Sequence, residues 1–396
     1  MTSGGDDSRA ALRIAMALSL AAAVSLGLAR FSYALLLAPM HEDLGWSYLT
    51  AGAMNTVNAG GYLLGALLAP RWLARFDARA ALLAGSIGAA ITLAAHGAVS
   101  SDAALYLLRF ATGVASAAAF VSGGLLAART AATRPQAAGL ILGIYYGGTG
   151  LGIVASALLV PPLVALPTMQ GWRWAWVALG IAAIASTALI AAGTRGLPSG
   201  PARTDGHSPF EWRPFLPGLA AYFLFGLGYI GYMTFVVTLL REQQIANTQI
   251  VVFFILLGMG VLASSWLWAG LLQRCRGGEA LALLNGLLAV ATVLPVFASH
   301  PLAVHASGLL FGAVFLSVVA STTALVRHNL PATLWPGGIA AFTIVFAAGQ
   351  IIGPSAVGWI ADGPGGLSLG LACSALVLAA GAACAWLQKP RAAPSR

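Results

Sequence analysis

The chain has 396 residues, of which 59% are hydrophobic and only 8% are charged, and its mean hydropathy is +0.87. Soluble globular domains carry about 25% charged residues, so this composition excludes a soluble domain and predicts a polytopic membrane protein. The formal net charge of +9 would suggest a nucleic-acid partner in a soluble chain. We expect no such partner, because the positions of the basic residues explain the charge.

Apolar segments of about 20 residues, the length that crosses the ~30 Å hydrocarbon core of a bilayer, predict the transmembrane helices. They cover residues 11–39, 49–69, 80–99, 103–127, 137–161, 173–192, 215–240, 249–272, 279–299, 302–326, 337–361 and 367–387. The long apolar run from 80 to 128 is divided in two only by the polar residues 100–102. We therefore predict an all-α membrane protein with twelve transmembrane helices.

Basic residues are distributed unevenly between the predicted loops. With the N-terminus placed inside, 16 of the 20 Lys and Arg residues fall in cytoplasmic segments, and two, Arg173 and Arg241, fall outside. This split follows the positive-inside rule and predicts that both termini are cytoplasmic. The polar start is short and the first apolar run is too long for a signal-peptide core, so we expect no cleaved leader.

The two halves of the sequence repeat at an offset of about 200 residues. Residues 27–33 fall on residues 226–232, and several single residues agree with this alignment: Gly61 and Gly260, Arg75 and Arg274, Gly113 and Gly312, Gly148 and Gly349, and Gly152 and Gly353. The repeat predicts two six-helix bundles with pseudo-two-fold symmetry, at 1–192 and 215–396. A cytoplasmic linker rich in Pro, Gly and charge is predicted at 193–214.

The whole chain resembles the major facilitator superfamily (MFS). The sequences GLARFSY at 27–33, DLGW at 43–46 and AGAMN at 51–55 resemble the bacterial YbfB/YjiJ-type branch. The resemblance implies an alternating-access carrier in a bacterial inner (plasma) membrane, which we expect to work as a monomer. It also implies that the first, fourth, seventh and tenth helices line a central cleft.

Three further segments resemble motifs of the superfamily. Residues 65–79 correspond to a loop that latches the cytoplasmic side, but Ala69 and Pro70 stand where an acidic residue is expected. Arg109, four residues before Gly113, resembles the arginine that is often tied to proton coupling. Residues 143–152 resemble the glycine-rich antiporter motif but lack its proline. The resemblance therefore implies proton coupling and leaves the direction of transport open.

Two arginines, Arg30 and Arg109, lie inside predicted helices. An arginine near the middle of a membrane helix costs ~3 to ~15 kcal/mol, depending on how far it can snorkel. At 1.5 Å per residue, both arginines are expected ~9 to 15 Å below the outer surface. Planar guanidinium groups suit bidentate capture of carboxylate or phosphate. We predict that the pair binds one anionic substrate, with a structural, gating or coupling role as the alternative.

All 11 acidic residues fall in loops or at the ends of predicted helices. The two arginines then lack an obvious counter-ion within the membrane, so water, carbonyls, hydroxyls or a substrate must satisfy their charge. Without a buried carboxylate, transport of organic cations is disfavoured and proton coupling lacks an acidic carrier. His96 and His305 could titrate in the useful range, or the carboxyl group of the substrate could carry the proton.

Other polar and aromatic side chains complete the predicted substrate site. The fourth helix carries a polar stripe at helical spacing (Tyr106, Arg109, Thr112, Gly113, Ser116), and the seventh an aromatic one (Tyr222, Phe225, Tyr229, Tyr232). The predicted substrate-binding residues are Arg30, Tyr33, Asn55, Asn58, Arg109, Thr112, Tyr146, Tyr229, Tyr232 and Gln350. For the Asn and Gln residues, hydrogen bonding between helices is the alternative role.

We therefore predict a secondary active transporter for a small organic anion such as a carboxylate, coupled to protons. The alternative is an efflux antiporter for neutral or amphipathic drugs or metabolites, favoured by the tyrosines of the seventh helix and the glycine-rich segment. A channel is disfavoured by the two-fold repeat. An enzyme would need a nucleophile with a base, paired acids or a metal cluster. The three cysteines show no metal-ligand spacing, and we expect no catalytic residue, metal or cofactor.

Overall fold

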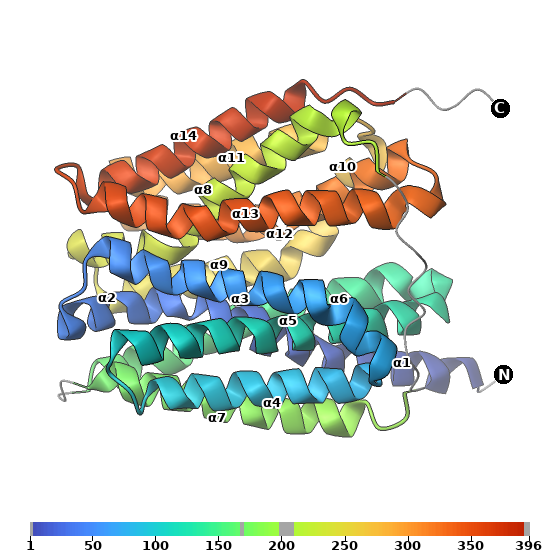
Figure 1. Ribbon diagram of the computed structural model, residues 1–396, viewed down its shortest axis with the longest axis horizontal. Coiled ribbons are helices and arrows are strands. Elements are labelled where there is room, and N and C mark those ends of the chain that lie inside the picture. The colour runs from blue at the N-terminus through green and yellow to red at the C-terminus, as the bar shows by residue number, and fades with distance from the viewer. Residues whose placement is uncertain (1–2, 167–169, 198–209, 392–396) are drawn as a thin grey trace. The chain divides into compact units, whose positions relative to one another are not determined.

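The computed structural model describes residues 3–166, 170–197 and 210–391. Within these ranges the chain is helical and contains no strand (Figure 1). Eleven of the described helical segments are long and apolar enough to cross a membrane. The helix that is not among them, α3 (Tyr48–Arg75), has 28 residues, but Asn55, Asn58 and several glycines lower its hydropathy. With α3 the described chain has twelve membrane-length segments, which confirms the predicted all-α membrane fold.

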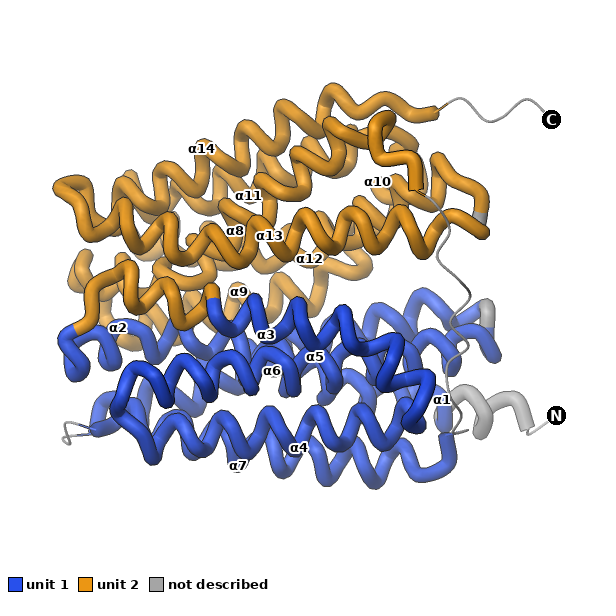
Figure 2. The backbone as a smooth tube through the Cα atoms, in the orientation of Figure 1, with its two compact units in different colours: residues 1–45, 57–204 blue, residues 46–56, 205–396 orange. Residues whose placement is uncertain are grey.

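Two compact units divide the chain, and Figure 2 colours them separately. Unit 1 contains residues 1–45 and 57–204, and unit 2 contains residues 46–56 and 205–396. The helix α3 therefore contributes its first residues to unit 2 and the rest to unit 1. The linker predicted at 193–214 falls mostly on residues 198–209, which lie outside the described residues.

The elements follow the predicted order. The first part of the chain forms α1 (Ser3–Ala22), η1 (Ala23–Phe31), α2 (Tyr33–Leu44), α3, α4 (Ala78–His96), α5 (Asp102–Ala132), η2 (Pro135–Ala137), α6 (Ala138–Val164) and α7 (Gly171–Gly193). The second part forms η3 (Arg213–Phe215), α8 (Leu216–Glu242), α9 (Asn247–Leu267), α10 (Ala269–Arg274), α11 (Glu279–Phe297), α12 (Pro301–Asn329), η4 (Ala332–Leu334), α13 (Trp335–Ala361) and α14 (Gly366–Trp386).

A π-helical segment, η1, interrupts the first transmembrane helix and contains Arg30. The amide of Ser32 donates to the carbonyl of Gly27 at 3.1 Å, a bond to the fifth residue back instead of the fourth. Gly27 packs directly on Gly152 of α6, where a Cβ atom would collide with the neighbouring backbone. Short π segments occur often at functional sites because they change which side chains face inward. This segment therefore sets the direction in which Arg30 points.

Glycines that are equivalent in the sequence repeat make equivalent packing contacts in the two units. In unit 1, a Cβ atom at Gly61 would collide with the carbonyl oxygen of Phe110. In unit 2, a Cβ atom at Gly260 would lie 2.6 Å from the carbonyl oxygen of Leu309. The offset between Phe110 and Leu309 is the same 199 residues that separates the two glycines. Each unit therefore joins the corresponding pair of helices, α3 with α5 and α9 with α12, by the same close approach.

The adjacent glycines Gly60 and Gly61 provide a matched test of this packing. Gly61→Ala is expected to destabilise the protein by about 1 to 3 kcal/mol or more, because α3 and α5 must move apart. Gly60 has no atom within 4 Å of an added Cβ. Gly60→Ala is expected to be neutral, or stabilising by up to ~1 kcal/mol, because alanine favours helix. Thermal unfolding in detergent measures both, and equal effects would contradict the packing.

Unit 2 holds the start of α3 through polar contacts with α13. The carboxylate of Asp362 accepts hydrogen bonds from the amides of Tyr48 at 2.7 Å and Leu49 at 3.0 Å. These amides have no acceptor within α3 because they open the helix, and a carboxylate at that end also interacts favourably with the helix dipole. Farther along, the hydroxyl of Thr56 donates to the carbonyl of Ile351 at 2.7 Å. These bonds fix residues 48–56 within unit 2.

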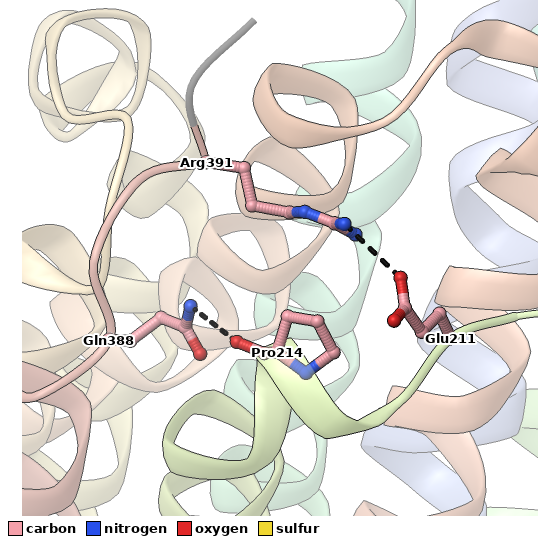
Figure 3. Close-up of polar contacts among 4 residues, drawn as sticks. All are labelled: Glu211, Pro214, Gln388 and Arg391. Carbon is pink, nitrogen blue, oxygen red and sulfur yellow. Dashed lines mark hydrogen bonds and ion pairs between the residues drawn. The ribbon is translucent and has the colours of Figure 1, made fainter. Parts of the chain in front are cut away.

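Gln388, just after α14, joins this end of α14 to the start of α8 (Figure 3). Its side-chain amide nitrogen donates to the carbonyl of Pro214 at 3.2 Å, and its side-chain oxygen accepts from the amide of Gly218 at 3.1 Å. The nearby ion pair between Arg391 and Glu211, at 3.2 Å, is exposed and contributes little to stability. The side chain of Gln388 is buried, so its hydrogen bonds, unlike the ion pair, are shielded from water.

Candidate functional site

Arg109 of α5 is fully buried inside unit 1. Its Nη1 donates to the carbonyl oxygen of Ala29 in η1 at 2.8 Å. Its guanidinium carbon lies 4.9 Å from the ring centre of Tyr33 and 5.8 Å from that of Trp176. Aromatic faces attract a cation, and this attraction strengthens when water is excluded. A carbonyl of the π-helical segment and the rings of α2 and α7 therefore surround the guanidinium of Arg109.

Arg30 lies in that same π-helical segment and is only 5% exposed. Its guanidinium carbon is 5.8 Å from the ring centre of Tyr62, and its Nη2 is buried without a hydrogen-bond partner in the described part of the chain. Among the described residues, no carboxylate pairs with Arg30. The positive charge of Arg30 also repels that of Arg109, so unit 1 buries two like charges near one another. A bound anion would reduce this repulsion and satisfy the free donor.

His96, the last residue of α4, adds a buried hydrogen-bond acceptor beside this pair. Its Nδ1 lies 2.6 Å from the carbonyl oxygen of Thr92. Because a carbonyl only accepts, we assign the proton of the neutral ring to Nδ1, which leaves Nε2 as an acceptor. Nε2 is buried, and no described residue bonds to it. The imidazole stacks on Trp176 at 4.5 Å, so one indole contacts both His96 and Arg109.

Five of the predicted site residues come together in unit 1: Arg30, Tyr33, Asn58, Arg109 and Thr112. The side chain of Asn58 donates to the backbone carbonyl of Arg109 at 3.0 Å, so it positions α5. The hydroxyl of Thr112 lies 2.9 Å from that of Thr92, the residue that orients His96. Tyr146 packs elsewhere, on Phe120 and Tyr145, with a side chain that is 43% exposed.

The other predicted site residues belong to unit 2, where they bond to one another or to neighbouring helices. Gln350 of α13 donates to the hydroxyl of Tyr229. Asn55 donates to the hydroxyl of Thr234 at 2.8 Å, and Tyr232 pairs with the hydroxyl of Ser307 at 2.6 Å. All of these side chains are buried. They have hydrogen-bond partners within unit 2, which distinguishes them from the Nη2 atom of Arg30.

The aromatic stripe of the seventh transmembrane helix, α8, splits between two neighbours. Tyr222, Phe225 and Tyr229 stack on Phe346 of α13, with ring centres 4.8 to 5.7 Å apart. Tyr232 instead stacks on Phe311 of α12 at 4.1 Å. Tyr229 also stacks on Phe315 of α12 at 6.0 Å, so the stripe passes from α13 to α12 along the length of α8.

Comparison with known families identifies the family of the chain. The sequence model of the family described as "Uncharacterised MFS-type transporter YbfB" matches residues 22–386, nearly the whole chain. The chain belongs to this family. The predicted YbfB-type resemblance is thereby confirmed, and a membrane transporter, not an enzyme, is the class of protein that the family and fold indicate. A search among curated proteins gives no match.

Solved structures show the same fold at low identity. The chain is similar to a bacterial homologue of the human lysosomal transporter Spinster, inward-facing and unoccupied, with 15% identity, a TM-score of 0.74 and 96% of each chain covered. A mutant of the nucleoside transporter NupG has 14% identity and a TM-score of 0.71, covering 94% of this chain and 100% of that one. The human organic anion transporter MFSD10 has 14% identity and a TM-score of 0.65, covering 95% and 99%.

For this YbfB-type transporter, sequence reasoning did not predict the part played by Trp176. The segment WRWAW at 172–176 has the composition of an interfacial aromatic belt. In the structure Trp176 is fully buried, and its Nε1 lies 3.4 Å from the sulfur of Met40. The available signal was its spacing from Trp172, four residues, which places both on one face of α7. That face points into unit 1, towards the arginines.

Proposed function

We propose that this transporter moves a small organic anion, such as a carboxylate, by alternating access, and that Arg30 and Arg109 bind the anion. The observation that carries the proposal is the pair of guanidinium groups buried in one unit, with an unpartnered Nη2 on Arg30. Among the residues whose burial is described, these are the only buried arginines. Their burial requires a compensating interaction, and an anionic substrate supplies one.

The described carboxylates support an anionic substrate because they lie at helix ends. Asp77 caps α4, Asp102 and Glu279 open α5 and α11, and Glu242 closes α8. Asp43 accepts from the indole of Trp172 at 2.7 Å near the end of α2. A substrate carboxylate would therefore be the acidic group that reaches the arginine pair, where a guanidinium can bind it through two parallel hydrogen bonds.

We propose His96 as the group that couples transport to protons. The positive charge of Arg109 acts on its imidazole. An anion bound at the arginines would offset that charge, so a proton would enter His96 more readily when the anion is present. The other ionisable groups facing this region are Arg30 and Tyr33 from the first transmembrane helix and Tyr106 from α5. The carboxylate of Asp102, at the start of α5, acts on Tyr106. We propose that His96 takes the proton because its Nε2 is a buried acceptor without a hydrogen-bond partner among the described residues.

The proposal extends to the membrane setting: the charge pattern favours cytoplasmic termini, and the family resemblance favours the membrane and the assembly state. We propose a bacterial inner membrane, both termini on the cytoplasmic side and a functional monomer. The likeness to the human organic anion transporter MFSD10, at 14% identity, agrees with an anionic substrate.

The direct test starts with thermal unfolding of the purified protein in the presence of small carboxylates, phosphates and neutral amphipathic compounds. Stabilisation by one class of carboxylate, followed by saturable counterflow of the same compound in proteoliposomes, is the expected result. Stabilisation and counterflow by neutral amphipathic compounds alone would favour efflux of such compounds instead. Hydrolysis or turnover without vesicles would contradict a carrier.

A further inference from the structure

An apolar groove of about 740 Å³ lies on unit 1 between α3, α4 and α5. Its volume is in the range of ~300 to 1,000 Å³ that small-molecule sites occupy. Six alanines and two glycines make up most of its thirteen lining residues, so its floor is recessed between larger neighbours. A Cβ atom at Gly85 would lie 2.5 Å from the backbone nitrogen of Ala119, which shows how closely α4 and α5 approach beneath the groove.

The groove has the length of one acyl chain. Its lining on α4 extends from Ala80 to Thr92, a rise of ~18 Å at 1.5 Å per residue. One leaflet of the hydrocarbon core is ~15 Å deep, half of the ~30 Å total. A straight apolar groove of this length along a membrane helix fits an extended hydrocarbon chain better than a compact solute.

Basic side chains stand at one end of the groove. Trp72 of α3 and Phe76, just after α3, line that end, and Phe76 is 59% exposed. Arg71 and Arg75 are exposed, and they are four residues apart on the same helix, so their side chains project from one face. Within the described residues neither makes a hydrogen bond or an ion pair. Two guanidinium groups with no partner among the described residues therefore lie next to the aromatic mouth of the groove.

The other charged groups at this end are already engaged. Arg79 donates to Thr194 at 3.1 Å and to the carbonyl of Ala191 at 2.9 Å. The carboxylate of Asp77 accepts from the amide of Ala80 at 3.3 Å as the cap of α4. Arg71 and Arg75 thus give this end an excess of positive charge, which attracts an anionic headgroup by ~1 kcal/mol per basic residue.

We propose that the groove binds one anionic phospholipid, with an acyl chain along α4 and the phosphate held by Arg71 and Arg75. This site is separate from the buried arginine pair. The groove nevertheless ends at Thr92, whose carbonyl orients His96, so a bound lipid contacts the helix that supports the proposed transport site.

Native mass spectrometry of the purified full-length protein tests the proposal, with equal amounts of phosphatidylglycerol and phosphatidylethanolamine of identical chains. Preferential binding of phosphatidylglycerol is expected. The double variant Arg71→Gln/Arg75→Gln should weaken phosphatidylglycerol binding by roughly thirtyfold, at ~1 kcal/mol per arginine, and weaken phosphatidylethanolamine binding less, because that headgroup carries no net charge. Arg274→Gln, the repeat equivalent of Arg75, should have no effect.

Ala84→Phe tests the part of the site that binds the acyl chain. It places a ring in the groove and should reduce the binding of both lipids. Glycerol phosphate without acyl chains should not compete. Equal occupancy by the two lipids, an equal loss in Arg274→Gln, or competition by glycerol phosphate would overturn the proposal. A protein dimer that Ala84→Phe abolishes would also overturn it, because a second copy would then fill the groove. Thermal unfolding of each variant confirms that it is folded.

Discussion

Arg30→Met is expected to abolish anion binding while leaving the ligand-free protein as stable as the wild type, or more stable. Arg30 is buried, and its Nη2 has no hydrogen-bond partner. Removing an unsatisfied buried charge relieves its desolvation penalty, and an apolar side chain of similar length fills the space. Losing a charge-assisted contact to the anion should cost about 3 kcal/mol or more, which is at least ~100-fold in affinity.

Calorimetric titration with an anion found by the thermal-unfolding screen measures the affinity, and thermal unfolding without ligand measures stability. Arg30→Lys should keep part of the affinity, because the charge remains but the bidentate geometry is lost. Arg109→Met is the matched comparison. It should lose stability as well as affinity, because Arg109 bonds to Ala29 and packs on two rings. A loss of stability in Arg30→Met with unchanged affinity would show that Arg30 is structural.

His96→Asn is expected to uncouple transport from the proton gradient. The asparagine amide can replace Nδ1 as the donor to Thr92, but it offers no group that titrates near neutral pH. With one proton per anion, the wild type should accumulate anion up to about tenfold per pH unit. His96→Asn should lose this accumulation and keep counterflow, which needs no net proton movement.

Uptake into proteoliposomes with an imposed pH gradient makes the measurement. His305→Asn is the control, because His305 lies on α12 in the other unit and should retain accumulation. Accumulation that persists in His96→Asn would contradict the coupling role. If its pH dependence then followed the acidity of different substrates, the proton would travel on the substrate carboxyl group.

The architecture was predictable because hydrophobic length is a direct physical requirement of the bilayer. The segment of α3 was predicted at 49–69 from its apolar length although its hydropathy is low, and the repeat supports it, since Gly61 aligns with Gly260. The two glycines make the same contact in their units. The sequence placed Arg30 and Arg109 at similar depths in the membrane, because depth depends only on helix rise and direction. In the structure Arg109 contacts the segment that contains Arg30.

Other features depend on contacts that sequence spacing does not specify. Asn55 and Asn58 are three residues apart on α3, but Asn55 bonds to α8 in unit 2 and Asn58 to α5 in unit 1. The two asparagines differ because α3 passes from unit 2 to unit 1 at residue 57, and no local sequence pattern predicts where that change occurs. The π-helical segment around Arg30 is equally unmarked, since it arises from the packing of Gly27 on Gly152.

Counterflow in proteoliposomes loaded with a small carboxylate tests the central claim most directly. The account predicts saturable exchange of the labelled anion in the wild type and its loss in Arg30→Gln, with normal folding of the variant. Anion exchange that is unchanged in Arg30→Gln, or exchange confined to neutral amphipathic compounds, would contradict an anion site at the buried arginines.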